Sequence, residues 1–356
     1  MLTAALCACV HDTRLDHAAY GAPRPAPYQR NPYQLVLPVP QSTPRPVQAP
    51  VGLTRAIDTL AKNFDGRVGI AVRSIDAGWT ISEGGDVRLP QQSVSKLWVA
   101  MTVLDARDAG RLRLDDPITI TKADLTVFHQ PIAYLLKNGE YKTTVGELLQ
   151  RALTMSDNTC NDRLLRYVGG PAAVRSFIAR KQLGNIRFGP GERLLQSQTA
   201  GLAWRSEYAF GNAFTLARAR LPQSARLAAF ESYVADPIDG AAPVAIADAL
   251  ARLKKGQLLS DDSTHYLIDT MESSKTGRYR MRAAIPAGWT FGHKTGTGQD
   301  LGRRTAGFND VGVLTAPNGH GYAIAVMIGD TPRPPAERQM LMQQVVASVV
   351  ANHKPY

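Results

Sequence analysis

The sequence predicts an α+β domain in which an antiparallel sheet, formed by both ends of the chain, lies beside a lobe of helices. Strand-like segments occur in two groups, one near residue 70 and one between residues 288 and 329. Segments with helical periodicity fill most of the chain between these groups. A last helical segment, at residues 335–350, follows the second group. Both chain ends therefore combine helix and strand, as a mixed α+β fold requires.

The folded domain is expected to begin near Gly52. A helix is predicted over residues 53–63, because Leu53, Ile57 and Leu60 recur on one face. The strand GRVGIAVRSI follows, then a turn at residues 76–78 and a second strand, WTISEG, which completes a hairpin. Apolar residues then recur at helical spacing from Val94 to residue 104, until Gly110 ends the pattern.

The middle of the chain is expected to be entirely helical. A candidate capping box, Thr144 to Glu147, begins the segment VGELLQRALTM. Further helices are predicted at residues 162–168, 171–181, 243–254 and 261–271. Three strands follow in GWTFGHKTG, NDVGVLTA and GYAIAVMIG, and a tight turn at residues 317–319 joins the last two.

The chain before Gly52 is expected to lie outside this domain. Residues 1–20 look like a truncated signal or lipoprotein-type leader, in which Cys9 follows a short stretch that resembles a lipoprotein processing site. An ordinary signal remnant without a lipid on Cys9 is the alternative. Nine prolines between residues 21 and 50 predict an extended linker over residues 21–51. Residues 52–356 are then the catalytic domain.

Charge and cysteine usage exclude several classes of protein. Lys and Arg exceed Asp and Glu by 41 to 30, but the basic residues are scattered, so we expect a basic soluble surface and no nucleic-acid partner. Beyond the first ten residues Cys160 is the only cysteine, which leaves no disulfide framework. The seven histidines show no metal-ligand spacing, so we expect no metal and no cofactor.

Ser93 and Lys96 lie three residues apart at the start of a predicted helix, so their side chains share one face. A serine hydroxyl becomes a nucleophile when a base removes its proton, and a buried lysine can act as that base. The alternative is a serine that caps the helix beside a solvated lysine. Ser95 has no lysine three residues on and is expected to be structural.

Ser156, Asp157 and Asn158 are predicted to lie in a loop between two helices. A hydroxyl and an amide two residues apart suit proton relay and recognition of a substrate amide. The alternative is a capping cluster for the following helix.

Lys294, Thr295 and Gly296 lie in the predicted strand GWTFGHKTG. A cation and hydroxyls on a strand edge can hold a carboxylate, and the backbone N–H of Thr297 can stabilise an oxyanion. A second Lys-Thr-Gly, at residues 275–277, lies where a helix stops and has no strand context, so Lys294 is preferred.

Ser-x-x-Lys, Ser-Asp-Asn and Lys-Thr-Gly, in this order, resemble the signature of serine β-lactamases and penicillin-binding proteins. Within that superfamily the chain is most similar to class A β-lactamases. The resemblance implies a β-lactamase-like fold with the active site between sheet and lobe, and hydrolysis of the β-lactam amide through an acyl-enzyme on Ser93. The alternatives are a D-alanyl-D-alanine peptidase or related esterase or amidase, and a non-catalytic penicillin or cell-wall sensing module.

Glu192, in GPGERLLQSQ, matches the family glutamate that activates the deacylating water. Three departures accompany this match. Gln196 replaces an asparagine that helps to hold the water, and Pro190 replaces an arginine whose salt bridge staples the loop. His293 replaces an aspartate before the Lys-Thr-Gly motif. The segment between Glu192 and Lys294 is also longer than in compact members, so we expect the loop to be held in a different way.

The resemblance also implies roles for the remaining residues. Ser156 relays a proton to the leaving nitrogen, and Asn158 binds the side-chain amide of the substrate. The substrate carboxylate is held by Lys294, Thr295, Gly296 and Thr297 together with Arg280, for which Arg278 and Arg282 are close rivals. Phe128 or His129 is expected at the rim. The protein is expected to be a periplasmic monomer that binds a small-molecule β-lactam, with a possible lipid anchor at Cys9.

Overall fold

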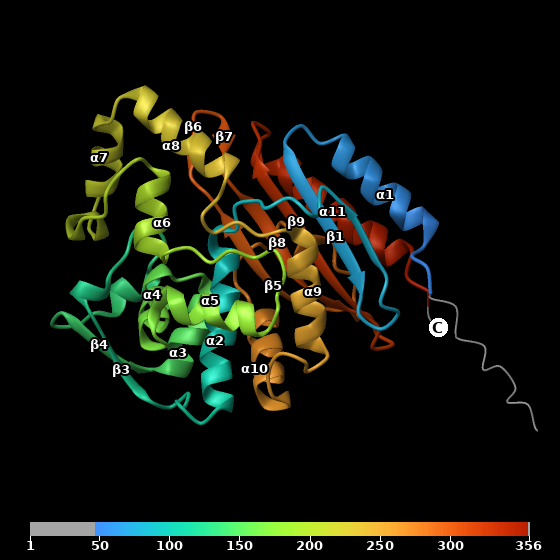
Figure 1. Cartoon of the computed structure of the whole chain (residues 1–356), viewed down its shortest axis with the longest axis horizontal. Coiled ribbons are helices and arrows are strands. Elements are labelled where there is room, and N and C mark those ends of the chain that lie inside the picture. Colours follow the sequence, from blue (N-terminus) through green and yellow to red (C-terminus); the bar gives the residue numbers. More distant parts are fainter. Residues whose placement is uncertain (1–46, 355–356) are drawn as a thin grey trace, which may run out of the picture. The chain divides into compact units, whose positions relative to one another are not determined.

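Five antiparallel strands in the order β2-β1-β9-β8-β5 form the sheet of the protein, for which we obtained a computed structural model (Figure 1). They are β1 (Arg67–Ser74), β2 (Thr80–Glu83), β5 (Thr290–Thr297), β8 (Phe308–Thr315) and β9 (Gly321–Asp330). The structure describes residues 47–354, so the predicted leader, most of the linker and Cys9 lie outside the described residues. The prediction that both ends of the domain build one antiparallel sheet is confirmed.

Side chains of the sheet alternate between its two faces, as the period of a strand requires. Helices α1 (Val51–Lys62) and α11 (Pro335–Ala351) cover the face that carries the larger aliphatic residues, Ile70, Val72, Ile324, Val326 and Ile328. The opposite face presents the small residues Ala71, Ala323 and Ala325. Because these alanines leave room, α9 (Pro243–Lys254) packs directly on β1, β8 and β9.

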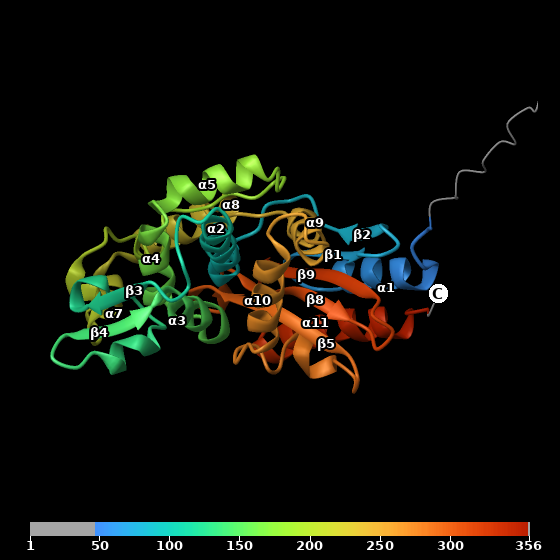
Figure 2. The ribbon, with the colours of Figure 1, turned by 90° about the horizontal axis from the view of Figure 1, so that it is seen from below.

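The helical lobe is built around α2 (Lys96–Asp108), which is buried on nearly all sides because its apolar residues continue around the helix. Figure 2 shows this lobe on one side of the molecule and the sheet with α1 and α11 on the other. Its further helices are α3 (Val145–Gln150), α4 (Asn158–Tyr167), α5 (Gly170–Arg180), α6 (Glu192–Thr199), α7 (Ala213–Arg220), α8 (Gln223–Ala235) and α10 (Asp261–Glu272). Within residues 47–354, no helix is both long and apolar enough to cross a bilayer.

The prediction of an entirely helical middle was wrong. Strands β3 (Pro117–Thr121) and β4 (Glu140–Thr144) pair as a small antiparallel sheet beside the lobe. The alternation in PITIT buries Ile118 and Ile120 on one face, a period-two signal that the five residues carry but that is short enough to overlook. A second short pair, β6 (Asp300–Leu301) with β7 (Arg304–Thr305), interrupts the connection between β5 and β8.

One predicted helix start and one predicted helix cap need correction. Helix α4 begins at Asn158 and not at residue 162, because the Asp157 carboxylate accepts a hydrogen bond from the Cys160 N–H at 3.0 Å and caps the helix there. The predicted capping box of α3 is half formed. Thr144 accepts from the Glu147 N–H, whereas the Glu147 carboxylate binds other side chains.

Candidate active site

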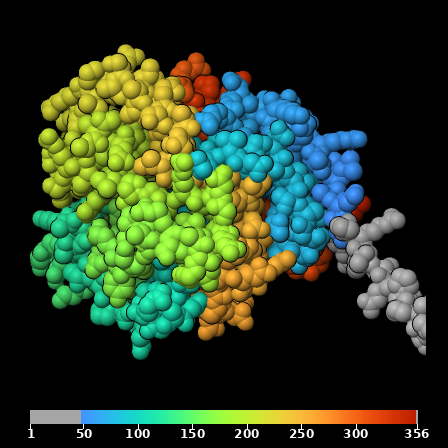
Figure 3. All heavy atoms as spheres, in the orientation of Figure 1, coloured from blue at the N-terminus to red at the C-terminus, as the bar shows by residue number. Residues whose placement is uncertain are grey.

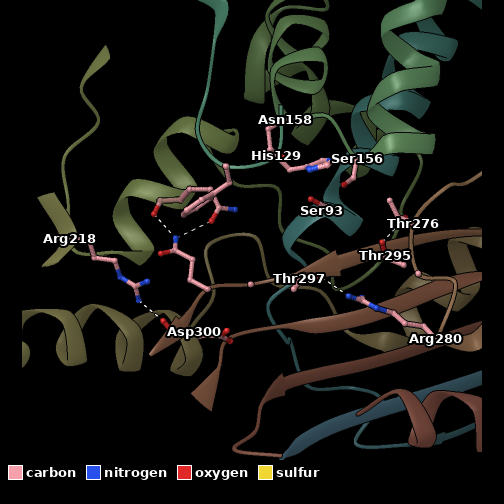
Figure 4. A pocket seen from close by; sticks show the side chains of 15 residues that line it. Ser93, His129, Ser156, Asn158, Arg218, Thr276, Arg280, Thr295, Thr297 and Asp300 are labelled. Atoms are coloured by element: carbon pink, nitrogen blue, oxygen red, sulfur yellow. Dashed lines mark hydrogen bonds between the residues drawn. The ribbon is translucent and has the colours of Figure 1, made fainter. Parts of the chain in front are cut away.

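A cavity of about 590 Å³ lies between the edge strand β5 and the helical lobe (Figure 4). It brings together the three sequence motifs, which are more than sixty residues apart along the chain. The residues that line it are Ser93, Phe128, His129, Ser156, Asn158, Gln196, Arg218, Thr276, Gly277, Arg280, Thr295, Thr297, Gly298, Gln299 and Asp300. Both residues considered for the rim, Phe128 and His129, are among them.

Ser93 lies in a 3-10 turn, Gln92–Ser95, that leads directly into α2, so Lys96 is the first residue of that helix. The Lys96 ammonium donates to the Ser93 hydroxyl at 2.6 Å and to the Asn158 side-chain oxygen at 2.9 Å, and forms a salt bridge with Glu192. The side chain of Lys96 is fully buried. The alternative of a solvated lysine is therefore excluded, while Ser95 bonds only the carbonyl of Gln92 and is structural.

Ser156 adopts a left-handed backbone conformation, with φ of 61°, at the end of a π-helical turn, Arg151–Met155. Such strained backbone, and such turns, occur often at functional sites. The conformation directs the hydroxyl of Ser156 to Lys294, whose ammonium lies 2.9 Å away. Burial lowers the pKa of Lys294 well below its usual value, and the positive charge of Lys96 lowers it further.

Asp157 and Asn158, the two residues after Ser156, differ in role: the first is structural and the second faces the cavity. Asp157 is structural, because its carboxylate accepts from the N–H groups of Ile132 and Cys160. Asn158 is held on both ends of its amide. Its oxygen accepts from Lys96, and its nitrogen donates to the carbonyl of Val127 at 2.9 Å. The capping alternative thus holds for Asp157, while Ser156 and Asn158 face the cavity.

Strand β5 passes unusually close to the backbone before Ser93, and glycine at position 296 permits this. A Cβ atom on Gly296 would lie 2.3 Å from the carbonyl oxygen of Gln91. From the neighbouring strand β8, the Asn309 amide donates to the carbonyls of Pro90 and Gln91 at 2.8 and 3.0 Å. The sheet edge and the turn that carries Ser93 are therefore fixed to each other.

Of the three candidates Arg278, Arg280 and Arg282, Arg280 is the one that lines the cavity. Its guanidinium donates to the carbonyls of Gly296 and Asn309 and to the Thr297 hydroxyl. Burial lowers its pKa to about 10. Of the two rivals, Arg278 stacks on Tyr279 at the surface, and Arg282 binds backbone carbonyls.

The rejected Lys-Thr-Gly at residues 275–277 has no strand conformation, as expected, but two of its residues still line the cavity. The Thr276 hydroxyl lies 2.9 Å from that of Thr295. Sequence reasoning missed this position because the second motif was set aside for its lack of strand context, whereas the segment after the helix still reaches the cavity wall.

His293 is a buried residue of β5 and does not line the cavity. Its Nδ1 is 2.7 Å from Asp310, and both side chains are fully buried. Asp310 also accepts from the N–H of Met281, the residue after Arg280. The substitution of the family aspartate by His293 therefore creates a buried pair that supports the segment carrying Arg280.

Glu192 is buried at the start of α6, and its second oxygen accepts from the Gln196 amide at 3.2 Å. Gln196 also donates to Gln92 at 3.0 Å and accepts from Gln299 at 3.0 Å. The longer glutamine side chain thus reaches the carboxylate from the position where the family has an asparagine. Within residues 47–354, no cluster of three or more His, Cys, Asp or Glu residues could hold a metal ion.

A family model described as the beta-lactamase enzyme family matches residues 52–353. The chain belongs to this family. Beta-lactamase Toho-1 from Escherichia coli is 28% identical over 83% of this chain and 87% of its own length. Extended-spectrum beta-lactamase PER-1 from Pseudomonas aeruginosa is 27% identical, over 85% and 86%. Among solved structures, TLA-1 extended-spectrum beta-lactamase superposes with a TM-score of 0.70 at 26% identity, over 84% of this chain and 97% of that one.

This β-lactamase holds its glutamate loop without the arginine that the family usually has at position 190. The carboxylate of Asp162 accepts from the N–H groups of Glu192 and Arg193 at 2.8 and 3.2 Å and so caps α6. The buried carboxylate of Asp239 accepts from the Tyr233 hydroxyl at 2.9 Å and from the Gln92 N–H at 2.8 Å. Hydrogen bonds to neutral groups thus replace the expected salt bridge.

The first part of the long segment after Glu192 forms α6, α7 and α8. Helices α7 and α8 are the yellow region at the upper left of Figure 3. This segment adds Arg218 to the cavity, and the connection after β5 adds Gln299 and Asp300. Sequence reasoning missed these three residues. None belongs to a motif, and the length of the segment between Glu192 and Lys294 was a signal for Arg218 alone.

Replacement of Gly296 by alanine is expected to destabilise this β-lactamase by about 1–3 kcal/mol, since the new methyl group meets a backbone oxygen that cannot move aside easily. Thermal unfolding followed by circular dichroism measures the effect. The matched control is Thr290→Ala, at an exposed position of the same strand, with an expected change within about 0.5 kcal/mol. Equal melting temperatures for the two variants would contradict the close approach of β5 to Gln91.

The buried acids should make stability depend on pH. Burial raises the pKa of Asp239 to about 7 and that of Asp162 to about 6, above the ordinary value of 3.8. Between pH 4 and 7 the folded state therefore binds more protons than the unfolded state, and the contribution of these groups to stability falls as pH rises. Asp239→Asn keeps the shape and removes one of the two groups.

For Asp239→Asn, the loss of unfolding free energy between pH 5 and pH 8 should be smaller than in the wild type by roughly 1 kcal/mol or more, since one pKa unit corresponds to about 1.4 kcal/mol. Urea unfolding at both pH values measures the difference. Wild-type and variant profiles that run parallel over this range would show that Asp239 does not titrate there.

Proposed function

We propose that the protein is a serine β-lactamase that opens the β-lactam amide through an acyl-enzyme on Ser93. One observation carries the proposal: the buried ammonium of Lys96 contacts both the Ser93 hydroxyl, at 2.6 Å, and the carboxylate of Glu192. A chain of hydrogen bonds thus joins the nucleophile, which lines the cavity, to Lys96 and through Lys96 to Glu192.

In the acylation step, Ser93 Oγ attacks the lactam carbonyl carbon and loses its proton. If the Lys96 proton first moves to Glu192, the resulting amine accepts the proton of Ser93. In the second route that the family implies, Glu192 takes this proton through a water. The direct contact of Lys96 with Ser93 supports the first route.

Cleavage of the C–N bond leaves a nitrogen that needs a proton. Ser156 supplies it, because its hydroxyl lies 2.9 Å from the Lys294 ammonium and faces the cavity. Backbone N–H groups of Ser93 and Thr297 stabilise the oxyanion. Asn158 binds the side-chain amide of the substrate. The carboxylate of the substrate is bound by Lys294, Thr295, Thr297 and Arg280. Gly296 allows the strand to approach closely.

Deacylation requires a base on the other side of the ester. Glu192 serves as that base, with Gln196 helping to position the attacking water, as the 3.2 Å contact between their side chains supports. A peptidase would not explain why a glutamate is buried against Lys96. A non-catalytic sensing module would not explain why Lys96 contacts the hydroxyl of Ser93. Neither is favoured by the family relationships.

Hydrolysis of a chromogenic cephalosporin should be lost in Ser93→Ala, with kcat/KM lower by about 10³-fold or more, because no nucleophile remains. In Glu192→Ala the buried Lys96 loses its counter-ion, which favours its neutral amine, so Ser93 should still be acylated while deacylation stops. Mass spectrometry of the intact protein should show a long-lived adduct. The control Ser95→Ala removes a hydroxyl that lies outside the cavity wall and should retain turnover. A stable adduct in the wild type would support a peptidase, and no adduct in any variant would leave only binding.

We propose further that the protein is an exported periplasmic monomer anchored by a lipid on Cys9. The small, apolar leader and the proline-rich linker support export and a spacer, and the cavity is completed by one chain. Cys9→Ser in the full-length chain should move the enzyme from the membrane fraction to the soluble fraction and abolish incorporation of labelled fatty acid. An unlabelled wild-type protein would favour the plain signal remnant.

A further inference from the structure

Arg218 is a cation of the cavity wall that the catalytic scheme does not use. It lies on α7, and in Figure 4 Arg218 and Arg280 lie on opposite sides of Ser93. The side chain is half-buried, and its guanidinium donates to the backbone carbonyl of Asp300 at 2.8 Å. The cavity therefore has a positively charged group on the side away from the Lys-Thr-Gly strand.

The charge of Arg218 has no close counter-ion. Among residues 47–354, no carboxylate forms a salt bridge with it. Asp300 favours the cation only from a greater distance, and its carboxylate accepts a hydrogen bond from Thr305. Burial lowers the pKa of Arg218, and the neighbouring charge of Arg226 lowers it further. A half-buried guanidinium in this state gains from contact with an anion.

An aromatic edge lies on the same wall. Phe214 precedes Arg218 by four residues, so both side chains lie on one face of α7. The ring of Phe214 packs edge-on against Phe128, with the ring centres 4.9 Å apart. Phe128 is half-exposed and lines the cavity. This wall therefore offers an aromatic surface next to a free positive charge.

We propose that Arg218 binds a carboxylate on the acyl side chain of the substrate and favours β-lactams whose side chain carries both an aryl group and a negative charge. The inference rests on the proposed function. With the ring carboxylate at Lys294 and the side-chain amide at Asn158, the rest of the side chain extends away from β5 toward α7. A guanidinium there can bind a carboxylate through two parallel hydrogen bonds.

Two penicillins that differ by one carboxylate test this inference: benzylpenicillin and α-carboxybenzylpenicillin. The measured quantity is the ratio of kcat/KM for the carboxylated substrate to kcat/KM for benzylpenicillin. Arg218→Gln should lower this ratio by about tenfold, as expected for the loss of a charge-assisted hydrogen bond. The control Arg220→Gln changes net charge equally on the same helix, at an exposed position outside the cavity wall, and should leave the ratio unchanged.

A second variant predicts a change of opposite sign. Asp300→Asn removes a negative charge beside the proposed subsite and leaves the backbone carbonyl that Arg218 binds, so the ratio should rise. This variant keeps the test valid even if Arg218→Gln folds poorly. Added salt should reduce both effects, because it screens charges.

The outcomes separate the inference from the proposed function. A wild-type protein that hydrolyses neither penicillin would overturn the proposed function and the inference with it. Steady hydrolysis of benzylpenicillin, with the same ratio in the wild type, Arg218→Gln and Asp300→Asn, would overturn the inference alone. A ratio that falls equally in Arg220→Gln would also overturn it, since general electrostatic attraction would then explain the preference.

Discussion

The buried salt bridge between Lys96 and Glu192 is the interaction on which the rest of the site depends. Removing both charges from water is costly, and it is tolerated only when hydrogen bonds satisfy the groups that remain. Lys96 meets this condition through Ser93 and Asn158, which come from two different elements. The turn before α2, the start of α4 and the start of α6 must therefore all be in place for the nucleophile to be activated.

The start of α6 must hold Glu192 in a fixed position beside Lys96, and this requirement explains the polar interior around the helix. A glutamate that must stay buried beside a lysine needs a loop that does not shift, and the family achieves this with an arginine that is absent here. Asp162 fixes the first turn of α6, while Gln196, Gln92 and Tyr233 connect it to Asp239. This arrangement replaces one ion pair by several shorter-range contacts, each of which depends on geometry more than on charge.

Periodicity and motif order were sufficient to predict the sheet, most long helices and that the three motifs meet at one cavity. These features are local, or they recur in a pattern that a single sequence displays. The start of α4 depends on the adjacent residue Asp157, which caps the helix. Two other features depend on contacts between distant segments. In the β3–β4 pair, Ile120 lies opposite Tyr141, 21 residues further along the chain, and Arg218 reaches the cavity wall because the long segment folds back. The spacing of residues in a single sequence does not show which distant segments come into contact.

The hydrogen bonds around Gln196 all run in one direction. Gln299 donates to Gln196, which donates to Glu192 and to Gln92. Gln92 donates to Tyr233, and Tyr233 donates to Asp239. The chain thus starts at the cavity wall and ends on two carboxylates. Reversing the amide of Gln196 or of Gln92 would place donor against donor at one end and acceptor against acceptor at the other. The network is therefore a hydrogen-bond chain with a defined direction, and a substrate group that contacts Gln299 contacts the same chain that holds the carboxylate of Glu192.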